Sequence, residues 1–190
     1  MTLSKEQLLS VVHEYWDSSN EFLVRQEASP KRRKLDALWD EKLKSLDLWS
    51  AFLRVLRSEL PGYVVGSMVT PIDASFRCVV YPDKDSRPPS SCWVVVGCVS
   101  ILAPVYILYG VECEYEGGRL RNHKASLEQP PPDMAFPASV VARKIEATFG
   151  CSVVPREIAE TPVPLFIEFK APPETTLFHA LFTSEPSSIP

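Results

Sequence analysis

The sequence predicts an α+β fold, in which helices and strands occupy separate stretches of the chain. Apolar residues recur at helical spacing over residues 4–60, and over residues 63–116 the spacing changes to the alternation of β-strands. The strands follow one another with no helix between them, which is typical of an antiparallel meander. We therefore expect N-terminal helices packed on a four-strand antiparallel meander, followed by a helix, short strands and a C-terminal helix.

Two helical regions are expected before the sheet. The first begins with a capping box, because Ser4 can cap the helix and Gln7 can bond back to it. We expect it to end at Ser29-Pro30, since the residue before a proline avoids the α region. The second region ends at Leu60-Pro61-Gly62, and it is either one long helix or two helices with a break near Asp47.

The strands and the C-terminal part follow in order. The four strands are expected at residues 63–70, 75–81, 92–102 and 105–116. A polyproline-like connector over residues 128–133 leads to a helix that has Pro137 in its first turn and ends at Gly150. Short strands at 152–154 and 165–169 and a helix at 175–182 complete one domain of residues 1–182. Residues 183–190 are expected to form a flexible tail.

The composition limits the classes of function. Twenty basic against 24 acidic side chains give a net charge of −4, which argues against nucleic-acid binding, because that needs a basic excess. Eighteen prolines and only seven glycines favour a scaffold with rigid loops over a backbone that closes around a phosphate. The five cysteines form no CxxC pair and mostly lie between apolar residues. They predict free, buried thiols in a reducing, cytoplasmic compartment.

One uncharged stretch, residues 90–111, is long enough to raise the question of a membrane helix. Pro104 lies in its middle, valines dominate it, and acidic residues follow directly after it. These features favour two buried strands. The N-terminus also lacks the apolar segment of a signal peptide, so the sequence predicts no membrane partner.

The strand at residues 105–116 carries the main candidate site. Its even-numbered positions, which share one face, include Tyr106, Glu112, Glu114 and Glu116. An aromatic anchor beside a row of carboxylates predicts a docking surface for a basic protein partner, with Arg77 as a neighbouring cross-strand residue. The structural alternative is a solvated strand end that blunts sheet pairing. A divalent metal site would need further ligands that the sequence does not place nearby.

No catalytic, cofactor-binding or metal-binding motif is found in the sequence. The segment His13-Glu14-Tyr15-Trp16-Asp17 begins like the zinc-protease HExxH, but Asp17 stands where the second histidine is needed. A small enzyme whose site is assembled from loops, with His123 and a carboxylate, is the alternative to a binding protein. The basic run at residues 31–34 is either an anion-binding or nuclear-localisation patch or a solvated helix start.

The small size, the capped N-terminal helix, the meander from Cys92 to Glu116 and its acidic end resemble bacterial immunity proteins that neutralise polymorphic or contact-dependent toxins. The resemblance implies a cytoplasmic, non-enzymatic protein without cofactor or metal that binds one cognate toxin domain, here a basic one. It transfers no residue roles, because no functional motif is shared. The order of elements is also similar to that of type III secretion chaperones, which are acidic, dimeric protein binders, so the sequence leaves a homodimer open.

Overall fold

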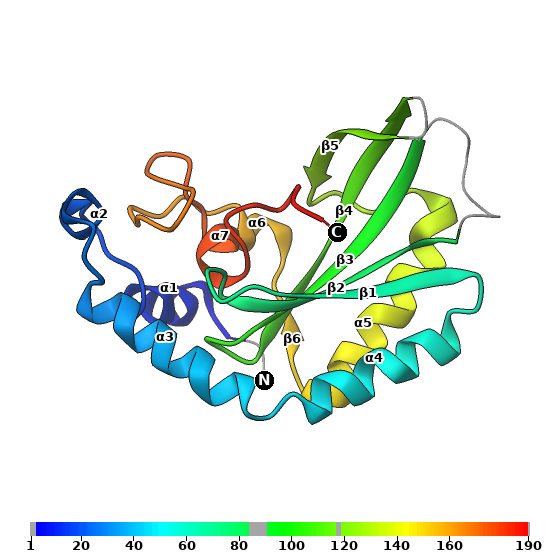
Figure 1. Cartoon of the computed structure of the whole chain (residues 1–190), viewed down its shortest axis with the longest axis horizontal. Coiled ribbons are helices and arrows are strands. Elements are labelled where there is room, and N and C mark those ends of the chain that lie inside the picture. Colours follow the sequence, from blue (N-terminus) through cyan, green and yellow to red (C-terminus); the bar gives the residue numbers. More distant parts are fainter. Residues whose placement is uncertain (1–2, 84–90, 117–118, 190) are drawn as a thin grey trace.

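A six-stranded sheet forms the centre of the computed structural model, which describes residues 3–83, 91–116 and 119–189 (Figure 1). Five strands follow in chain order as antiparallel neighbours: β1 Tyr63–Val69, β2 Ser75–Pro82, β3 Ser91–Ser100, β4 Val105–Glu116 and β5 Arg119–Ser126. A sixth, β6 (Ser152–Val153), pairs in parallel with the start of β4. The α+β fold with an antiparallel meander is confirmed, and the meander is one strand longer than predicted.

Four helices precede the sheet: α1 Lys5–His13, α2 Glu21–Arg25, α3 Pro30–Leu43 and α4 Asp47–Glu59. The capping box of Ser4 and Gln7 is present, but the prediction that this helix continues to Ser29 is wrong. The turn-forming run Asp17-Ser18-Ser19-Asn20 interrupts it, because these short polar side chains compete for backbone hydrogen bonds. The second region is two helices, and Asp47 is the first residue of α4 rather than its cap, which is Leu46.

The C-terminal part contains η2 (Pro132–Met134), α5 (Ala135–Phe149), α6 (Arg156–Ala159) and α7 (Leu177–Leu181). Helix α5 ends at Gly150 as predicted, and the left-handed φ of 64° there is one that glycine adopts without strain. The strand expected at residues 165–169 is present only as isolated bridges, from Phe166 to Asp17 and from Ile167 to Lys170.

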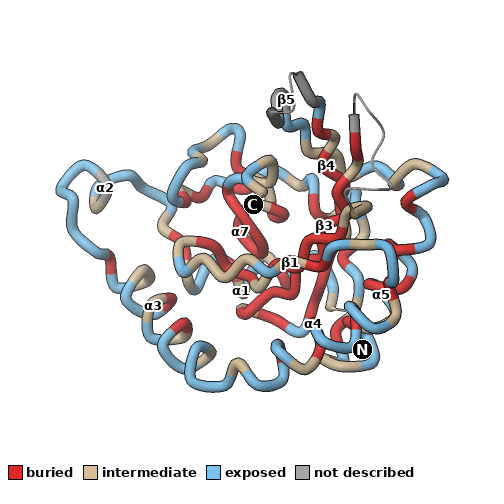
Figure 2. Tube along the Cα trace, turned by 45° about the vertical axis from the view of Figure 1, so that its right-hand side comes forward, coloured by how far each residue is buried: buried red, intermediate tan, exposed pale blue. Residues whose placement is uncertain are grey.

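Helices cover both faces of the sheet. Side chains of α1, α3 and α7 pack on one face, where they meet Val94, Val96 and Ile107. Side chains of α4 and α5 pack on the other face, where they meet Val95 and Val99. Figure 2 shows the result, with β3 buried over residues 94–100 and α2 largely exposed. The uncharged stretch is thus the hairpin of β3 and β4, and within the described ranges no helix has the length and apolarity to cross a bilayer.

The segment after α7 does not extend into solvent. Thr183 and Ser184 are buried, with 0% and 3% of their surface exposed. The side chain of Arg77 donates a hydrogen bond to the carbonyl of Ser188 at 3.0 Å. The predicted boundary at residue 182 is therefore corrected, because residues 183–189 pack on the sheet as part of the domain.

Candidate functional site

A hollow of about 540 Å³ opens between the corner of α3 and α4, the turn from β3 to β4, and the C-terminal end of α5. We call it the aromatic groove. Its floor is formed by Trp49, Phe76 and Phe149, and its walls by the turn at residues 99–104. Lys42 is the charged side chain among the lining residues. A volume in this range, with mostly apolar walls, is typical of binding sites.

The floor is apolar because its aromatic rings pack on one another. The ring of Trp49 in α4 stacks on Phe76 of β2, with centroids 5.3 Å apart, and lies 5.9 Å from Phe149 of α5. The indole N–H of Trp49 donates to Oγ of Ser67 in β1 at 2.9 Å, so its polar group is satisfied within the protein. The floor therefore offers a partner apolar contact with little hydrogen bonding.

The rim of the aromatic groove is also mostly apolar, with Lys42 and Ser45 as polar members. Leu48 is 53% exposed although its neighbour Trp49 is buried, because successive residues of a helix point about 100° apart. On the other side, the turn Ile101-Leu102-Ala103-Pro104 contains no polar side chain, and Pro104 is exposed. Exposed apolar side chains beside an apolar hollow are typical of an interaction site.

Cys151 lies at the edge of the aromatic groove and is 8% exposed. Burial raises the pKa of its thiol, so the sulfur is protonated at neutral pH and is a poor nucleophile. The other four cysteines are buried free thiols as well. The aromatic groove therefore presents packing surface rather than an activated nucleophile.

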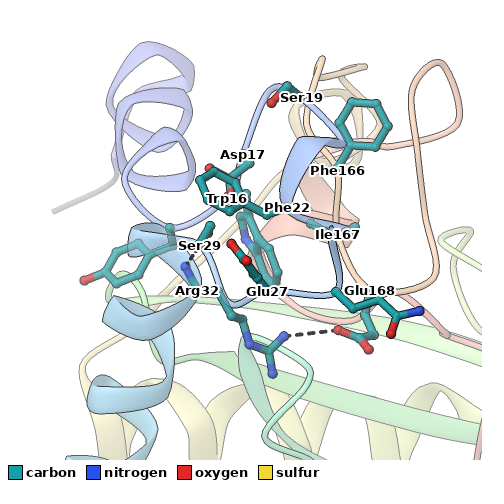
Figure 3. Close-up of a pocket in the computed structure, with 12 residues that line it drawn as sticks. Trp16, Asp17, Ser19, Phe22, Glu27, Ser29, Arg32, Phe166, Ile167 and Glu168 are labelled. Carbon is teal, nitrogen blue, oxygen red and sulfur yellow. Dashed lines mark hydrogen bonds and ion pairs between the residues drawn. The ribbon is translucent and has the colours of Figure 1, made fainter. Parts of the chain in front are cut away.

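A second hollow, of about 210 Å³, lies between α2, the start of α3 and residues 166–168 (Figure 3). Two of its charged side chains, Arg32 and Glu168, join α3 to the C-terminal part of the chain. Arg32 bonds to Asp36 at 2.9 Å and to Glu168 at 3.2 Å, and Ser29 caps α3 by accepting from the backbone N–H of Arg32. Because Arg32 is engaged by two carboxylates, we assign this hollow a structural role.

The basic run at residues 31–34 is likewise engaged within the protein. Lys31 donates to the carbonyl of Trp16 at 3.0 Å and Arg33 to that of Ala28 at 2.6 Å. Lys34 pairs with Glu14 and lies over the ring of Tyr15, 4.5 Å from its centroid. These contacts favour the interpretation as a helix start over that of an anion-binding patch.

Two of the predicted contact residues lie inside the protein. Tyr106 is 2% exposed, and its hydroxyl donates to Glu146 of α5 at 2.6 Å. Arg77 is 3% exposed and pairs with Asp73 at 2.9 Å. Their role as an exposed aromatic anchor and its cross-strand neighbour is corrected, because α5 covers the first and the C-terminal segment covers the second.

The acidic end of β4 faces basic positions on β5. The backbone register sets Glu112 opposite Lys124, Glu114 opposite Arg121 and Glu116 opposite Arg119. Glu112 is half-buried and Glu114 exposed, whereas the side chains of Glu116, Arg119 and Arg121 lie outside the described part. Opposite charges at facing positions stabilise a sheet and reduce the net negative charge of this end.

An aromatic side chain does lie beside these carboxylates, but it comes from β3. Trp93 pairs in register with Glu112 and is half-buried. A Cβ atom added at Gly110 would lie 2.7 Å from its ring, so the ring rests on the glycine. The sequence pattern missed this residue because it lies on a strand that reads as apolar on both faces.

The residues that could support catalysis are dispersed. His123 is exposed, and its Nδ1 lies 3.3 Å from the carbonyl oxygen of Ser187. His179 accepts the backbone N–H of Thr176 at 3.1 Å, and burial lowers its pKa to about 4. In the described part of the chain, no three His, Cys, Asp or Glu residues cluster so that they could hold a metal ion.

The sequence did contain a signal for the aromatic groove. The helical spacing of Trp49 predicts a core position and does not mark a groove, but a hairpin turn made of Ile101-Leu102-Ala103-Pro104 departs from the polar composition of most turns. Comparisons of the chain with protein-family models, curated proteins and solved structures find no match. The assignment of a function therefore depends on the geometry of the site.

Proposed function

We propose that the protein is a non-enzymatic protein-binding module and that the aromatic groove is its binding surface. The observation that supports this most directly is the continuity of apolar surface from the buried ring of Trp49 to the exposed side chain of Leu48. Burial of such surface by a partner is favourable because it removes apolar area from water. An apolar floor with a single lysine at its edge suits aliphatic side chains on one face of a partner helix.

Within this class, we propose a cytoplasmic inhibitor of a basic toxin domain. The resemblance to immunity proteins supports this assignment, as do the net charge of −4 and the five free thiols. Exposed Glu114, and Glu112 at the same strand end, would then attract the partner at long range, while the aromatic groove would supply the contact area.

A pair of photo-crosslinking variants tests the groove. A benzophenone amino acid is placed at Leu48, and in a matched variant at Val55, which is 41% exposed and lies two turns further along the same side of α4. In native host cells, we expect one discrete heterologous crosslink from position 48 and none from position 55. Equal labelling from both positions, or crosslinks to this chain alone, would contradict the proposal.

The toxin assignment has its own test. The partner identified by the crosslink is purified, and its toxicity is measured in cells with and without the protein. We expect a basic domain whose toxicity is abolished by the wild-type chain and restored when Leu48 is replaced by Asp. A harmless partner would remove the toxin assignment and leave the binding module intact.

A further inference from the structure

The face of the sheet opposite the aromatic groove carries a buried polar cluster that holds the C-terminal segment of the chain. Five of the eight described residues that are buried and also polar or charged belong to it: Asp73, Ser75, Arg77, Thr183 and Ser184. The first three come from the start of β2 and the turn before it, and the last two follow α7. Figure 1 shows this segment in red, crossing the sheet beside α7. We call residues 183–189 the strap.

Side chains of β2, of β4 and of the turn before β2 bind main-chain atoms at every second residue, from Phe182, which precedes the strap, to Ser188. Ser75 Oγ donates to the carbonyl of Phe182 at 2.9 Å, and Asp73 Oδ1 accepts the N–H of Ser184 at 3.2 Å. Further along, the Tyr109 hydroxyl donates to the carbonyl of Pro186 at 3.1 Å, and Arg77 Nη1 donates to that of Ser188 at 3.0 Å. The site thus recognises the course of a backbone more than the identity of its side chains.

The strap holds its shape through a turn. The N–H of Ser188 donates to the carbonyl of Glu185 at 3.1 Å, which closes a turn with Pro186 in its second position. Proline is favoured there because its ring fixes φ. Another peptide with the same turn could present the same carbonyls to Tyr109 and Arg77.

The side chains of the strap are held unevenly. Thr183 is fully buried, and Oγ of Ser187 accepts the backbone N–H of Ala125 at 3.3 Å. Glu185 and Ser188 are exposed, and Pro186, Ser187 and Ile189 are only half-buried. The hydroxyl of Ser184 is buried and has no hydrogen-bond partner among the described residues. An unsatisfied buried hydroxyl destabilises the bound position of the strap.

In contrast to most strap side chains, the two side chains of the ion pair beneath the strap are buried and paired. Asp73 and Arg77 are each about 3% exposed at their side chains and lie 2.9 Å apart. Burying two charges carries a desolvation cost that a well-packed apolar pair would avoid. Arg77 also donates to a carbonyl of the strap, and Asp73 accepts one of its N–H groups. The ion pair therefore supplies a hydrogen-bond donor and an acceptor for the backbone of a peptide.

We propose that this face is a second binding site, which takes a proline-containing turn of another protein, and that the strap is its built-in competitor. The proposal does not rest on the aromatic groove, which lies on the other face of the sheet. A partner segment would replace the strap and use its three anchors, Asp73, Tyr109 and Arg77, and the free protein would keep the site closed.

The test uses the full chain and a fluorescent peptide with the sequence of residues 183–190. Ser184→Pro removes the N–H that binds Asp73 and so loosens the strap without altering the sheet residues. By fluorescence anisotropy, we expect the peptide to bind this variant about tenfold more tightly than the wild type, as loss of one hydrogen bond to a charged group predicts. Adding Tyr109→Phe should weaken binding about fivefold, and a peptide with Gly in place of Pro186 should bind more weakly than the unaltered one.

Three outcomes would overturn the proposal. One is the absence of saturable peptide binding to a Ser184→Pro variant whose circular dichroism matches the wild type. Another is a concentration-dependent dimer that exchanges its straps, which would make a second copy the occupant. If the variant does not fold, hydrogen exchange of the wild type is the deciding measurement. Strap amides that exchange well before global unfolding support the proposal. The third contradicting outcome is that strap amides exchange only with global unfolding.

Discussion

The two faces of the sheet are covered in different ways. On the face of α4 and α5, the core contacts are mainly between aliphatic and aromatic side chains, and this layer opens at one end into the aromatic groove. On the face of α7, an apolar layer is joined by a buried ion pair and hydroxyl groups that fix the strap. Figure 1 shows α4 and α5 on one side and the strap with α7 on the other.

The difference shows what each kind of contact can do. Apolar packing is not directional, so a layer of helices can leave a hollow at its edge and still be stable. Hydrogen bonds and ion pairs are directional, so the polar cluster fixes one segment in one position. We therefore expect substitutions in the polar cluster to change stability and the hold on the strap, and substitutions at the rim of the aromatic groove to change partner binding with little effect on stability.

The largest effect is expected at the buried ion pair. Arg77→Met leaves the carboxylate of Asp73 buried without its cation, and should lower the free energy of unfolding by about 3–5 kcal/mol. Urea denaturation measures this loss. Combining Arg77→Met with Asp73→Asn should recover part of it, because the second change removes the unpaired charge. If the two losses simply add, the residues do not act as a pair.

The next effect is expected at the rim of the aromatic groove, and it concerns binding rather than stability. Leu48→Asp should weaken partner binding about tenfold or more, as loss of an apolar contact at an interface centre does. Because Leu48 is exposed, the free energy of unfolding should change by no more than about 0.5 kcal/mol. The matched change Val55→Asp should leave the dissociation constant unchanged in calorimetry. Equal losses from both variants would point to a general charge effect.

A smaller effect, with a pH dependence, is expected at α7. Burial lowers the pKa of His179 from 6.5 to about 4, so between these values the unfolded chain binds the proton more strongly than the folded protein does. Stability should therefore fall as the pH drops from 7 to 5. After allowing for partial solvent exposure of the ring, the share of His179 is about 1 kcal/mol.

His179→Gln isolates this contribution. His179 is the third residue of a capping box begun by Thr176, and glutamine is also suited to that position. We expect the variant to keep the helix and to lose less stability than the wild type between pH 7 and pH 5. Thermal melts at the two pH values make the comparison. An identical drop in both proteins would exclude His179 as its source.

The smallest effect is expected at the acidic end of β4. Glu112→Lys sets two lysines opposite each other across β4 and β5, which should cost about 0.2–1 kcal/mol of stability. In stopped-flow measurements at low salt, association with a basic partner should slow and its salt dependence should decrease. Lys124→Glu is the converse control, and it should accelerate association. Unchanged association rates in both variants would show that this end of the sheet does not attract the partner electrostatically.

Local features of the fold were predictable from the sequence. The capping box of Ser4 and the left-handed stop at Gly150 depend on residues within one turn, and the meander depends on alternation along each strand. Apolar spacing predicts a first helix longer than α1, because it takes no account of the polar run at residues 17–20. Local chemistry, in short, predicts where elements begin and end better than spacing alone.

The candidate site was harder to predict, because burial depends on segments distant in the sequence. Tyr106 is covered by Glu146, 40 residues further along the chain, and Arg77 by Ser188, 111 residues away. Likewise, the carboxylates of β4 meet lysine and arginine positions only through the register with β5. The alternation of β4 predicts that its odd-numbered positions face the core, and Ile107, Tyr109 and Val111 are buried, but alternation does not show what covers the other face.

The most direct test of the account is a hydrogen-exchange footprint of the protein with and without its crosslinked partner. We predict slower exchange in residues 42–49 and 99–104, which line the aromatic groove, and little change over residues 112–124. Protection confined to residues 112–124, with the groove segments unaffected, would contradict the account and return the binding surface to the acidic end of the sheet.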